Sequence, residues 1–373
     1  MTALSRILQE SSKSFSELSV ETGIAEVRIR ALASGAEASM GELRLLASAF
    51  KASVTDLLEE PKYQAPAQLL FRKAVQEKPR FRSSADEQWL RLTSKSLELI
   101  DRNACSFDWF KSIPTVAETY AGAEELSLQF RGLFFEGDDL SPMLQLPEIV
   151  EGQLGIPVLI APSKTTEGAS AVVQGLPFVF VAPRFPPRML FTLAHEVGHI
   201  LAHHDLSQDF VTVDEDEGNL WKSKDKSERF ADAFASCLLL PRRGLGIALN
   251  KIREFVSHSG GPVGDVEILY VAYIFGVSFE VAARRCEALE LLPQGGALSL
   301  YEELCKSYGS PEKRAVDAGL PPRNEIRFPP VSNVLLSHAI RKVRQERLSI
   351  GRAAALLQVT VADLTAFNAP PLQ

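Results

Sequence analysis

The sequence predicts a mainly α-helical protein with a small β-sheet, an α+β fold. Apolar residues recur at helical spacing over most of the 373 residues, and three short β-rich segments lie close together between residues 156 and 181. The length suggests two or three domains. We divide the chain into four segments: a helix-turn-helix bundle at 1–60, a helical linker or scaffold at 61–145, an α+β domain at 146–292 and a helical C-terminal region at 293–373.

The first segment predicts a small helical bundle. Residues 15–24 form a short helix ending in a Gly turn, a second helix runs from Ala25 to Ser34, and further helices are expected at 40–50 and 54–58. This pattern resembles the Xre-type family of DNA-binding domains. The resemblance implies that the second helix presents Glu26, Arg28 and Arg30 to a DNA major groove.

The charge of this segment does not decide whether it binds DNA or another protein. Residues 1–60 hold six Lys and Arg against nine Asp and Glu, whereas phosphate neutralisation normally supplies much of the affinity for DNA. Both DNA binding and protein docking, for example against the helix-turn-helix domain of a substrate, therefore stay as hypotheses.

The second segment reads as a linker followed by scaffold helices. We expect helices at 67–75 and 84–103, separated by an exposed basic stretch at 78–82. Trp89 and the leucines that follow it give the second of these helices a core face. Helices at 126–135 and 146–153 continue the scaffold.

A small sheet is predicted next. Strands are expected at 156–160, 169–173 and 176–181, and Gln174-Gly175 joins the last two into a hairpin. Pro177 near the start of a strand favours an edge position. The sheet either offers an edge to an extended peptide or only covers the helix that follows.

The next helix carries the most informative motif of the chain. His195, Glu196 and His199 lie in an apolar helix at 191–201, preceded by two prolines. Imidazoles at i and i+4 share one helical face, where both can bind one Zn²⁺ ion. Glu196 then acts as the base that takes a proton from the attacking water. Alternatively, the two histidines are satisfied by hydrogen bonds in a core. Gly198 indicates close approach of another backbone.

Two residues compete to be the third metal ligand. His203 lies one turn after His199, but three ligands on one straight helix surround a tetrahedral ion poorly, so we interpret His203 as part of a polar helix end. Glu228 opens a second apolar helix that Pro241 ends. Asp232, one turn beyond Glu228, can accept a hydrogen bond from the outer nitrogen of a ligand histidine. Glu228 as a favourable first-turn carboxylate is the alternative.

The remaining segments are less specific. Residues 205–227 are rich in Asp and Lys and read as a solvated loop, with a mobile lid as the alternative. Helices are expected at 247–256, 266–275 and 278–291. The tail predicts a helical pair at 335–347 and 349–357, with a short helix at 361–364. Its arginines form either a solvated basic face or a docking surface.

Two patterns together resemble the ImmA/IrrE-type metallopeptidases. They are Arg188-x-x-Phe191-Thr192-Leu193-Ala194-His195-Glu196-Val197-Gly198-His199, and Glu228-x-x-Ala231-x-x-Phe234-Ala235-x-x-Leu238-Leu239-x-Pro241. The resemblance covers about Leu146 to Pro241, with weaker similarity onward to about Leu292, and implies a zincin-like metallopeptidase domain at 146–292. It also implies Zn²⁺ bound by His195, His199 and Glu228, and a catalytic carboxylate at Glu196. Many members of this family cleave a helix-turn-helix repressor and so switch on stress or mobile-element genes.

Composition sets the remaining expectations. The net charge of −7 gives no strong non-specific attraction to nucleic acid. Four widely spaced cysteines do not suggest a disulfide framework, and Cys237 reads as a small buried residue. With no signal segment or long apolar run, we expect a cytoplasmic protein without a membrane partner. The sequence favours a zinc endopeptidase that cleaves a protein. The alternative is a DNA- or repressor-binding regulator with a structural or vestigial zinc.

Overall fold

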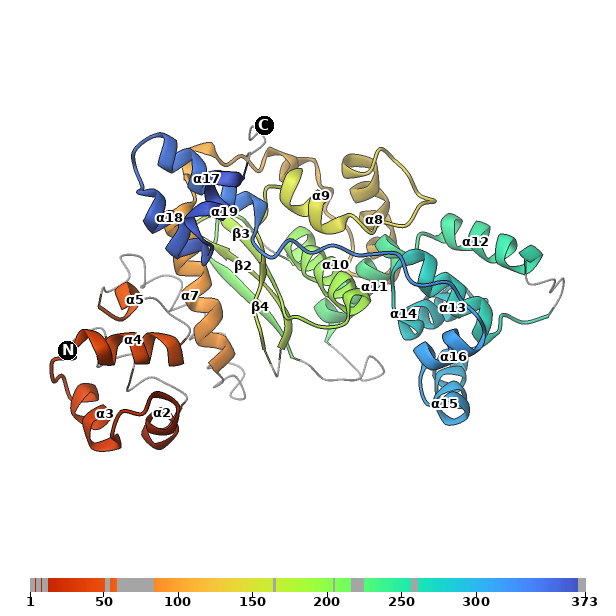
Figure 1. Cartoon of the computed structure of the whole chain (residues 1–373). Helices are drawn as coiled ribbons and strands as arrows, with labels where there is room; N and C mark the ends of the chain where they lie inside the picture. Colours follow the sequence, from red (N-terminus) through yellow and green to blue (C-terminus); the bar gives the residue numbers. More distant parts are fainter. Residues whose placement is uncertain are drawn as a thin grey trace. The chain divides into compact units, whose positions relative to one another are not determined.

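The computed structural model divides the chain into two compact units, shown in Figure 1. One unit comprises Met1–Asp101 with Leu335–Gln373, and the other comprises Arg102–Val334. The structure describes residues 4, 8, 13–50, 54–58, 84–163, 166–203, 205–215, 225–255 and 261–367. The helix expected at 67–75 and the basic stretch at 78–82 lie outside the described residues.

The N-terminal part of the first unit is the predicted helical bundle. Its helices are α2 (Phe15–Thr22), α3 (Glu26–Ala33), α4 (Met40–Ala49) and α5 (Val54–Leu58). Capping boxes begin α2 at Ser14 and α4 at Ser39, and Gly23 ends α2 in the left-handed conformation. The turn between α2 and α3 therefore falls where the sequence places it, and the predicted helices are confirmed.

The first unit also contains α7 and the C-terminal helices, which are α7 (Ser84–Leu99), α17 (Asn333–Arg344), α18 (Ile350–Leu357) and α19 (Val361–Ala366). Trp89 of α7 is buried, as predicted. The guanidinium of Arg352 donates two hydrogen bonds, each 3.0 Å long, to the carboxylate of Glu98. Arg352 of the basic tail is therefore paired with a carboxylate of α7, although the sequence placed it on a solvated or docking face.

The second unit is built around a mixed four-stranded sheet. Its strands are β1 (Val158–Ile160), β2 (Thr166–Val173), β3 (Leu176–Val181) and β4 (Phe210–Glu215), in the order β1-β3-β2-β4. The predicted hairpin is confirmed, because β2 and β3 are antiparallel and Gln174 and Gly175 both have positive φ in the turn between them. β1 runs parallel to β3.

Two expectations about the sheet were wrong. Residues 210–215, expected in a solvated loop, form β4 on the edge of the sheet against β2. Pro177 is not on an edge strand, because β3 lies between β1 and β2. Pro177 is tolerated because it opposes Val172 next to the two-residue turn, at a position where the two strands do not exchange hydrogen bonds. Its nitrogen therefore points away from β2, toward the side on which β1 lies. On that side β1 pairs with β3 only from Val179 onward.

The other elements of the second unit are helices. They are η1 (Arg102–Ala104), η2 (Asp108–Ser112), α8 (Tyr120–Phe134), α9 (Leu146–Gly152), α10 (Pro186–His203), α11 (Lys226–Leu239), α12 (Arg242–Phe255), α13 (Asp265–Phe275), α14 (Phe279–Ala288), α15 (Gly296–Tyr308) and α16 (Pro311–Asp317). α10 packs against β2 and β3 on one side and against α11 on another, and α11 also contacts α8 (Figure 1). The long apolar helix of the motif is therefore central to the unit.

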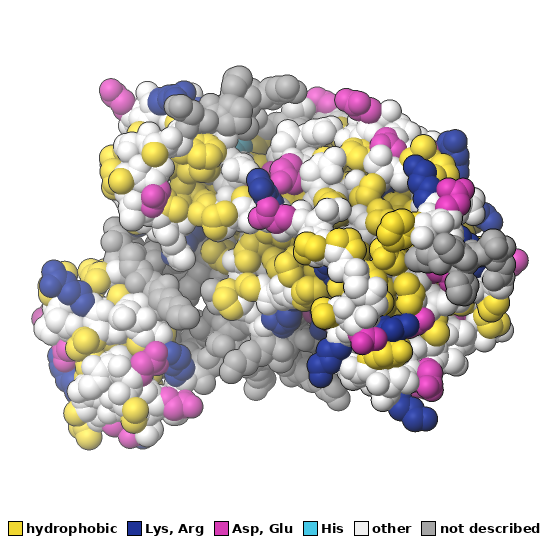
Figure 2. All heavy atoms as spheres, turned by 45° about the vertical axis from the view of Figure 1, so that its right-hand side comes forward, with side chains coloured by type: hydrophobic (Ala, Val, Ile, Leu, Met, Phe, Trp, Pro, Cys, Tyr) yellow, Lys and Arg dark blue, Asp and Glu magenta, His cyan; other side chains and the backbone are white. Residues whose placement is uncertain are grey.

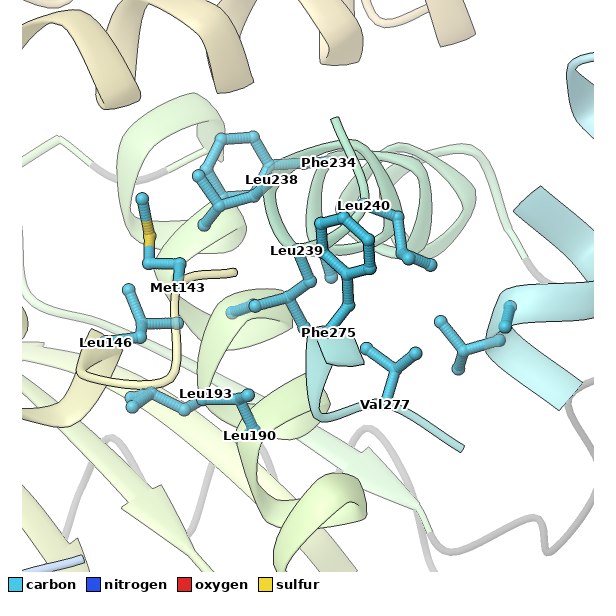
Figure 3. Close-up of a cluster of buried hydrophobic side chains, with 14 of the residues drawn as sticks. Met143, Leu146, Leu190, Leu193, Phe234, Leu238, Leu239, Leu240, Phe275 and Val277 are labelled. Atoms are coloured by element: carbon cyan, nitrogen blue, oxygen red, sulfur yellow. The ribbon is translucent and has the colours of Figure 1, made fainter. Parts of the chain in front are cut away.

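The main core lies where α10, α11 and α13 meet. Figure 3 shows Leu190 and Leu193 of α10 near Leu239 of α11 and Phe275 of α13, and all four are at most 1% exposed. The close approach predicted from Gly198 is confirmed. A Cβ at this position would lie 2.9 Å from the Phe234 ring and 3.5 Å from the Cα of Ala231 in α11.

One face of the molecule carries side chains of both charges. On the face shown in Figure 2, Lys and Arg side chains alternate with Asp and Glu, and apolar side chains lie between them. Within the described ranges, no single helix is long and apolar enough to cross a membrane; α13 and α14 pass that test only as a pair bent by 109°.

Candidate metal centre

α10 places two imidazoles on one buried face. His195 and His199 are 2% and 1% exposed, and their Nε2 atoms are 3.0 Å apart. The apolar residues around them, including Leu193, Val197 and Ile200, are fully buried. This packing fixes the rotation of α10 about its axis, so both imidazoles must face the same side.

α11 brings Glu228 to these imidazoles. Asp225 caps the helix by accepting a hydrogen bond of 2.9 Å from the backbone N–H of Glu228, which sets where α11 begins. Glu228 Oε2 then lies 3.3 Å from His195 Nε2, and Oε1 lies 3.4 Å from His199 Nε2. Burial raises the pKa of the Glu228 carboxyl, but contact with the two imidazoles outweighs this effect and lowers the pKa overall. The carboxylate is therefore held in its ionised form.

The donor set fits a zinc ion. One ligand atom each from His195, His199 and Glu228 lies within 4.8 Å of the others. Zinc binds imidazole nitrogen and carboxylate oxygen at about 2.0–2.2 Å, which places neighbouring donors roughly 3 to 3.5 Å apart. The observed separations of 3.0, 3.3 and 3.4 Å match that requirement. These three residues can hold a metal, and three protein ligands leave a position for water.

Each histidine of this group also has a partner at its outer nitrogen. His195 Nδ1 lies 2.9 Å from Asp232 Oδ1, the contact expected from the spacing in α11. His199 Nδ1 lies 3.1 Å from the Nδ1 of His203, whose Nε2 lies 3.7 Å from Glu118. His203, interpreted from the sequence as a polar helix end, is only 12% exposed at its side chain. Its i+4 spacing from His199 is a sequence signal from which this contact could have been predicted.

Glu118 was not identified from the sequence. It precedes α8, far from the motif in the chain, and its other carboxylate oxygen lies 3.2 Å from the Nζ of Lys226 in α11. The sequence carries no spacing signal for such a residue, because only the packing of α8 on α11 brings it to the site.

Glu196 lies on the side of α10 that faces the sheet. It is fully buried, and a Cβ added to Gly168 of β2 would come within 2.7 Å of its Oε1. Arg188 in the first turn of α10 forms an ion pair with Glu167 in the same strand. Glycine at 168 therefore leaves the space that the Glu196 side chain occupies.

The three residues proposed for DNA contact lie on α3 and form ion pairs within the bundle. The guanidinium of Arg28 donates hydrogen bonds of 2.6 and 3.0 Å to the carboxylate of Glu42, which lowers the pKa of Glu42 to about 2. Arg30 donates to Glu26, at 2.6 Å. The structure thus brings each arginine to a carboxylate of the bundle, and DNA binding by this surface stays a prediction.

Fold and site together define a metallopeptidase-type domain, with two histidines from His-Glu-x-x-His and a glutamate from the following helix around one position. Residues 151–287 match a peptidase family, Peptidase_M78, described as the IrrE N-terminal-like domain. The matched segment is therefore similar to the IrrE N-terminal-like domain, and it includes all three candidate ligands. The comparison with curated proteins gives no match.

Proposed function

We propose that this protein is a zinc-dependent endopeptidase that cleaves a protein substrate. The observation that carries the proposal is the convergence of His195, His199 and Glu228, with Glu196 directly after the first of them in α10. The match to a peptidase family supports the same class of reaction. A closed structural zinc site would need no such carboxylate next to its ligands.

His195, His199 and Glu228 would hold the zinc ion. The chemistry that zinc supplies when bound is Lewis acidity, which makes water more acidic and polarises a peptide carbonyl. Glu196 accepts the proton of the attacking water and delivers it to the leaving amine. Asp232 fixes the tautomer and orientation of His195, because it accepts a hydrogen bond at Nδ1.

An extended segment of the substrate would bind along β4. This strand is one edge of the sheet, and its neighbour β2 carries Gly168, which borders Glu196. Asp214 of β4 pairs with Gly168. A peptide that adds to this edge by backbone hydrogen bonds would therefore run close to the proposed base.

The substrate class follows from analogy with the peptidase family and from the N-terminal bundle. We infer that the substrate is a regulatory protein such as a helix-turn-helix repressor. The α2–α3 arrangement gives the chain a module suited to docking on such a protein or on its DNA site. If the module serves only to bind a repressor or DNA, the protein is a regulator and cleaves nothing.

The decisive experiment is a cleavage assay with zinc-loaded protein. The purified chain is incubated with candidate repressors, above all one encoded beside its gene, and fragments are identified by mass spectrometry. We expect discrete fragments that disappear on chelation and in Glu196→Gln, while Glu196→Gln still binds zinc. Equal turnover by Glu196→Gln would refute the role of this carboxylate. Stable binding of a repressor without fragments would favour the regulator instead.

A further inference from the structure

A pocket of about 220 Å³ lies beside the candidate metal centre in the second unit. Its walls come from α8, α10, α11 and α14, and they include Phe191, Arg229, Asp232, Ser236, Val281 and Arg284. We call it the α11 pocket. Asp232 lines this pocket and is also the hydrogen-bond partner of His195 Nδ1. A group bound in the pocket would therefore be separated from the candidate metal ligand His195 by a single side chain, that of Asp232.

The size and the apolar walls limit what the pocket can take. Typical sites for drug-sized ligands enclose roughly 300–1,000 Å³, so the α11 pocket suits a smaller group, such as one amino-acid side chain. The Phe191 ring, Val281 and two alanines supply apolar surface. Tyr120 forms a further wall, and its hydroxyl is bonded to the buried guanidinium of Arg285. Arg285 also forms a 2.7 Å ion pair with Glu124 of α8, which holds Tyr120 in place.

The charges of the lining favour an anion. The residues that line the pocket include two arginines, Arg229 and Arg284, and one aspartate, Asp232. The Asp232 carboxylate is directed to His195 Nδ1 at 2.9 Å. Burial lowers the pKa of Arg284, while the charges of Asp232, Glu287 and Glu280 oppose that shift. An arginine stays protonated at neutral pH, and its planar fork of donors matches a carboxylate.

We propose that the α11 pocket binds a group with a small apolar body and a carboxylate, which Arg284 recognises. Such a group is either an acidic residue of the substrate or a free carboxylic acid. Assignment to the substrate rests on the proposed peptidase function, whereas binding of the carboxylate does not. Because Asp232 lines the pocket and holds the His195 ring, a group bound in the pocket would also affect the orientation of His195.

Binding is tested on the full-length, zinc-loaded protein with 3-phenylpropionate and its neutral amide, 3-phenylpropanamide. Titration calorimetry should give at least about tenfold tighter binding for the acid, because a hydrogen bond to a charged group is worth more than a neutral one. Arg284→Met keeps an apolar side chain of similar length and should abolish this preference. Arg242→Met, on the exposed start of α12, removes the same charge elsewhere and should keep it.

Three results would overturn the proposal: equal binding of acid and amide, no binding of either, or an unchanged preference in Arg284→Met. A thermal melt shows whether Arg284→Met is folded. If it is not, Arg284→Lys takes its place, and this variant should keep a reduced preference because it retains the charge but loses the fork.

Peptide substrates separate the two sources of the carboxylate. Peptides that differ only by Glu or Gln at successive positions around the scissile bond are compared by kcat/KM. A preference for Glu at one position, expressed in KM and lost in Arg284→Met, assigns the pocket to the substrate. Binding of 3-phenylpropionate without any such preference assigns it to a free acid. If no peptide is cleaved but the acid still binds through Arg284, the peptidase function fails and the pocket assignment stands.

Discussion

His195 Nδ1 lies 2.9 Å from Oδ1 of Asp232, while Nε2 of the same ring faces Glu228 at 3.3 Å. Glu228 and Asp232 are one turn apart on α11, so one face of one helix supplies a candidate ligand and the partner of a second ligand. Because Asp232 accepts a hydrogen bond from the Nδ1–H group of His195, the Nε2 lone pair is directed at the metal position. The position of α11 against α10 thus sets both contacts at once.

Removal of the Asp232 carboxylate should weaken zinc binding. Asp232→Asn keeps the size of the side chain but removes its charge, and we expect zinc affinity to fall by about 10- to 100-fold, as for other outer-shell partners of metal ligands. Competition with a chromophoric chelator measures this directly. Asp108→Asn, which removes an exposed carboxylate of η2, is the control and should not change the affinity. Unchanged affinity in Asp232→Asn would mean that Asp232 does not orient His195.

His203 should have the equivalent role for His199. If His199 binds metal through Nε2, its Nδ1 carries the proton and donates a hydrogen bond of 3.1 Å to His203 Nδ1. His203→Phe removes this acceptor and should lower zinc affinity by up to about tenfold. His203→Asn restores an acceptor and should recover part of the loss. Equal affinities for the Phe and Asn variants would contradict a hydrogen-bonding role. Glu118→Gln should have a smaller effect, since its contact with His203 is longer, at 3.7 Å.

Most helices could be predicted because their signals are local. Apolar spacing, the capping serines and the glycine after α2 depend on a few neighbouring residues, and the structure follows them at Ser14, Gly23 and Ser39. The same holds for the motif on α10, whose spacing alone sets two donors on one face. The convergence of Glu228 also followed from a local signal, a carboxylate at the start of an apolar helix with Asp232 one turn later.

The errors occur where pairing between distant segments decides the structure. β4 lies among acidic residues, and only its partner β2 makes a strand of 210–215. The sequence offered no sign that β1 would flank β3, so Pro177 was assigned to an edge. Glu118 was not identified for the same reason. It lies before α8, and only the packing of α8 against α11 brings it near the site. The α11 pocket likewise needs α8, α10, α11 and α14 together.

A methyl group at Gly198 should destabilise the domain although alanine favours helices. In Gly198→Ala, the new Cβ would lie 2.9 Å from the buried Phe234 ring, so α10 and α11 must move apart. Overpacking costs up to about 3 kcal/mol, and helix propensity returns about 1 kcal/mol. We therefore expect a net loss of up to about 2 kcal/mol in the free energy of unfolding. Gly246→Ala in α12 meets no atom within 4 Å and should be neutral or stabilising. Urea denaturation compares the two, and equal changes would exclude the steric explanation.

The buried carboxyl of Glu151 should make stability depend on pH. It is 4% exposed and accepts hydrogen bonds from the backbone N–H groups of Val158 and Asn333, and burial raises its pKa from 4.5 to about 7. The folded protein therefore holds this proton more tightly than the unfolded chain. Its contribution to stability is complete below pH 4.5 and is lost as the pH rises to about 7. At about 1.4 kcal/mol for each pH unit, the loss is roughly 3 kcal/mol.

Glu151→Gln isolates this effect, because its side chain does not titrate. The difference in unfolding free energy between wild type and Glu151→Gln should fall by up to about 3 kcal/mol from pH 4.5 to 7.5. Urea denaturation at several pH values measures that difference. Glu148→Gln, exposed on the same helix, should follow the wild-type pH dependence. A difference that does not change with pH would show that Glu151 has the same pKa in the folded and unfolded chain. In that case a protonated Glu151 carboxyl does not link α9 to β1.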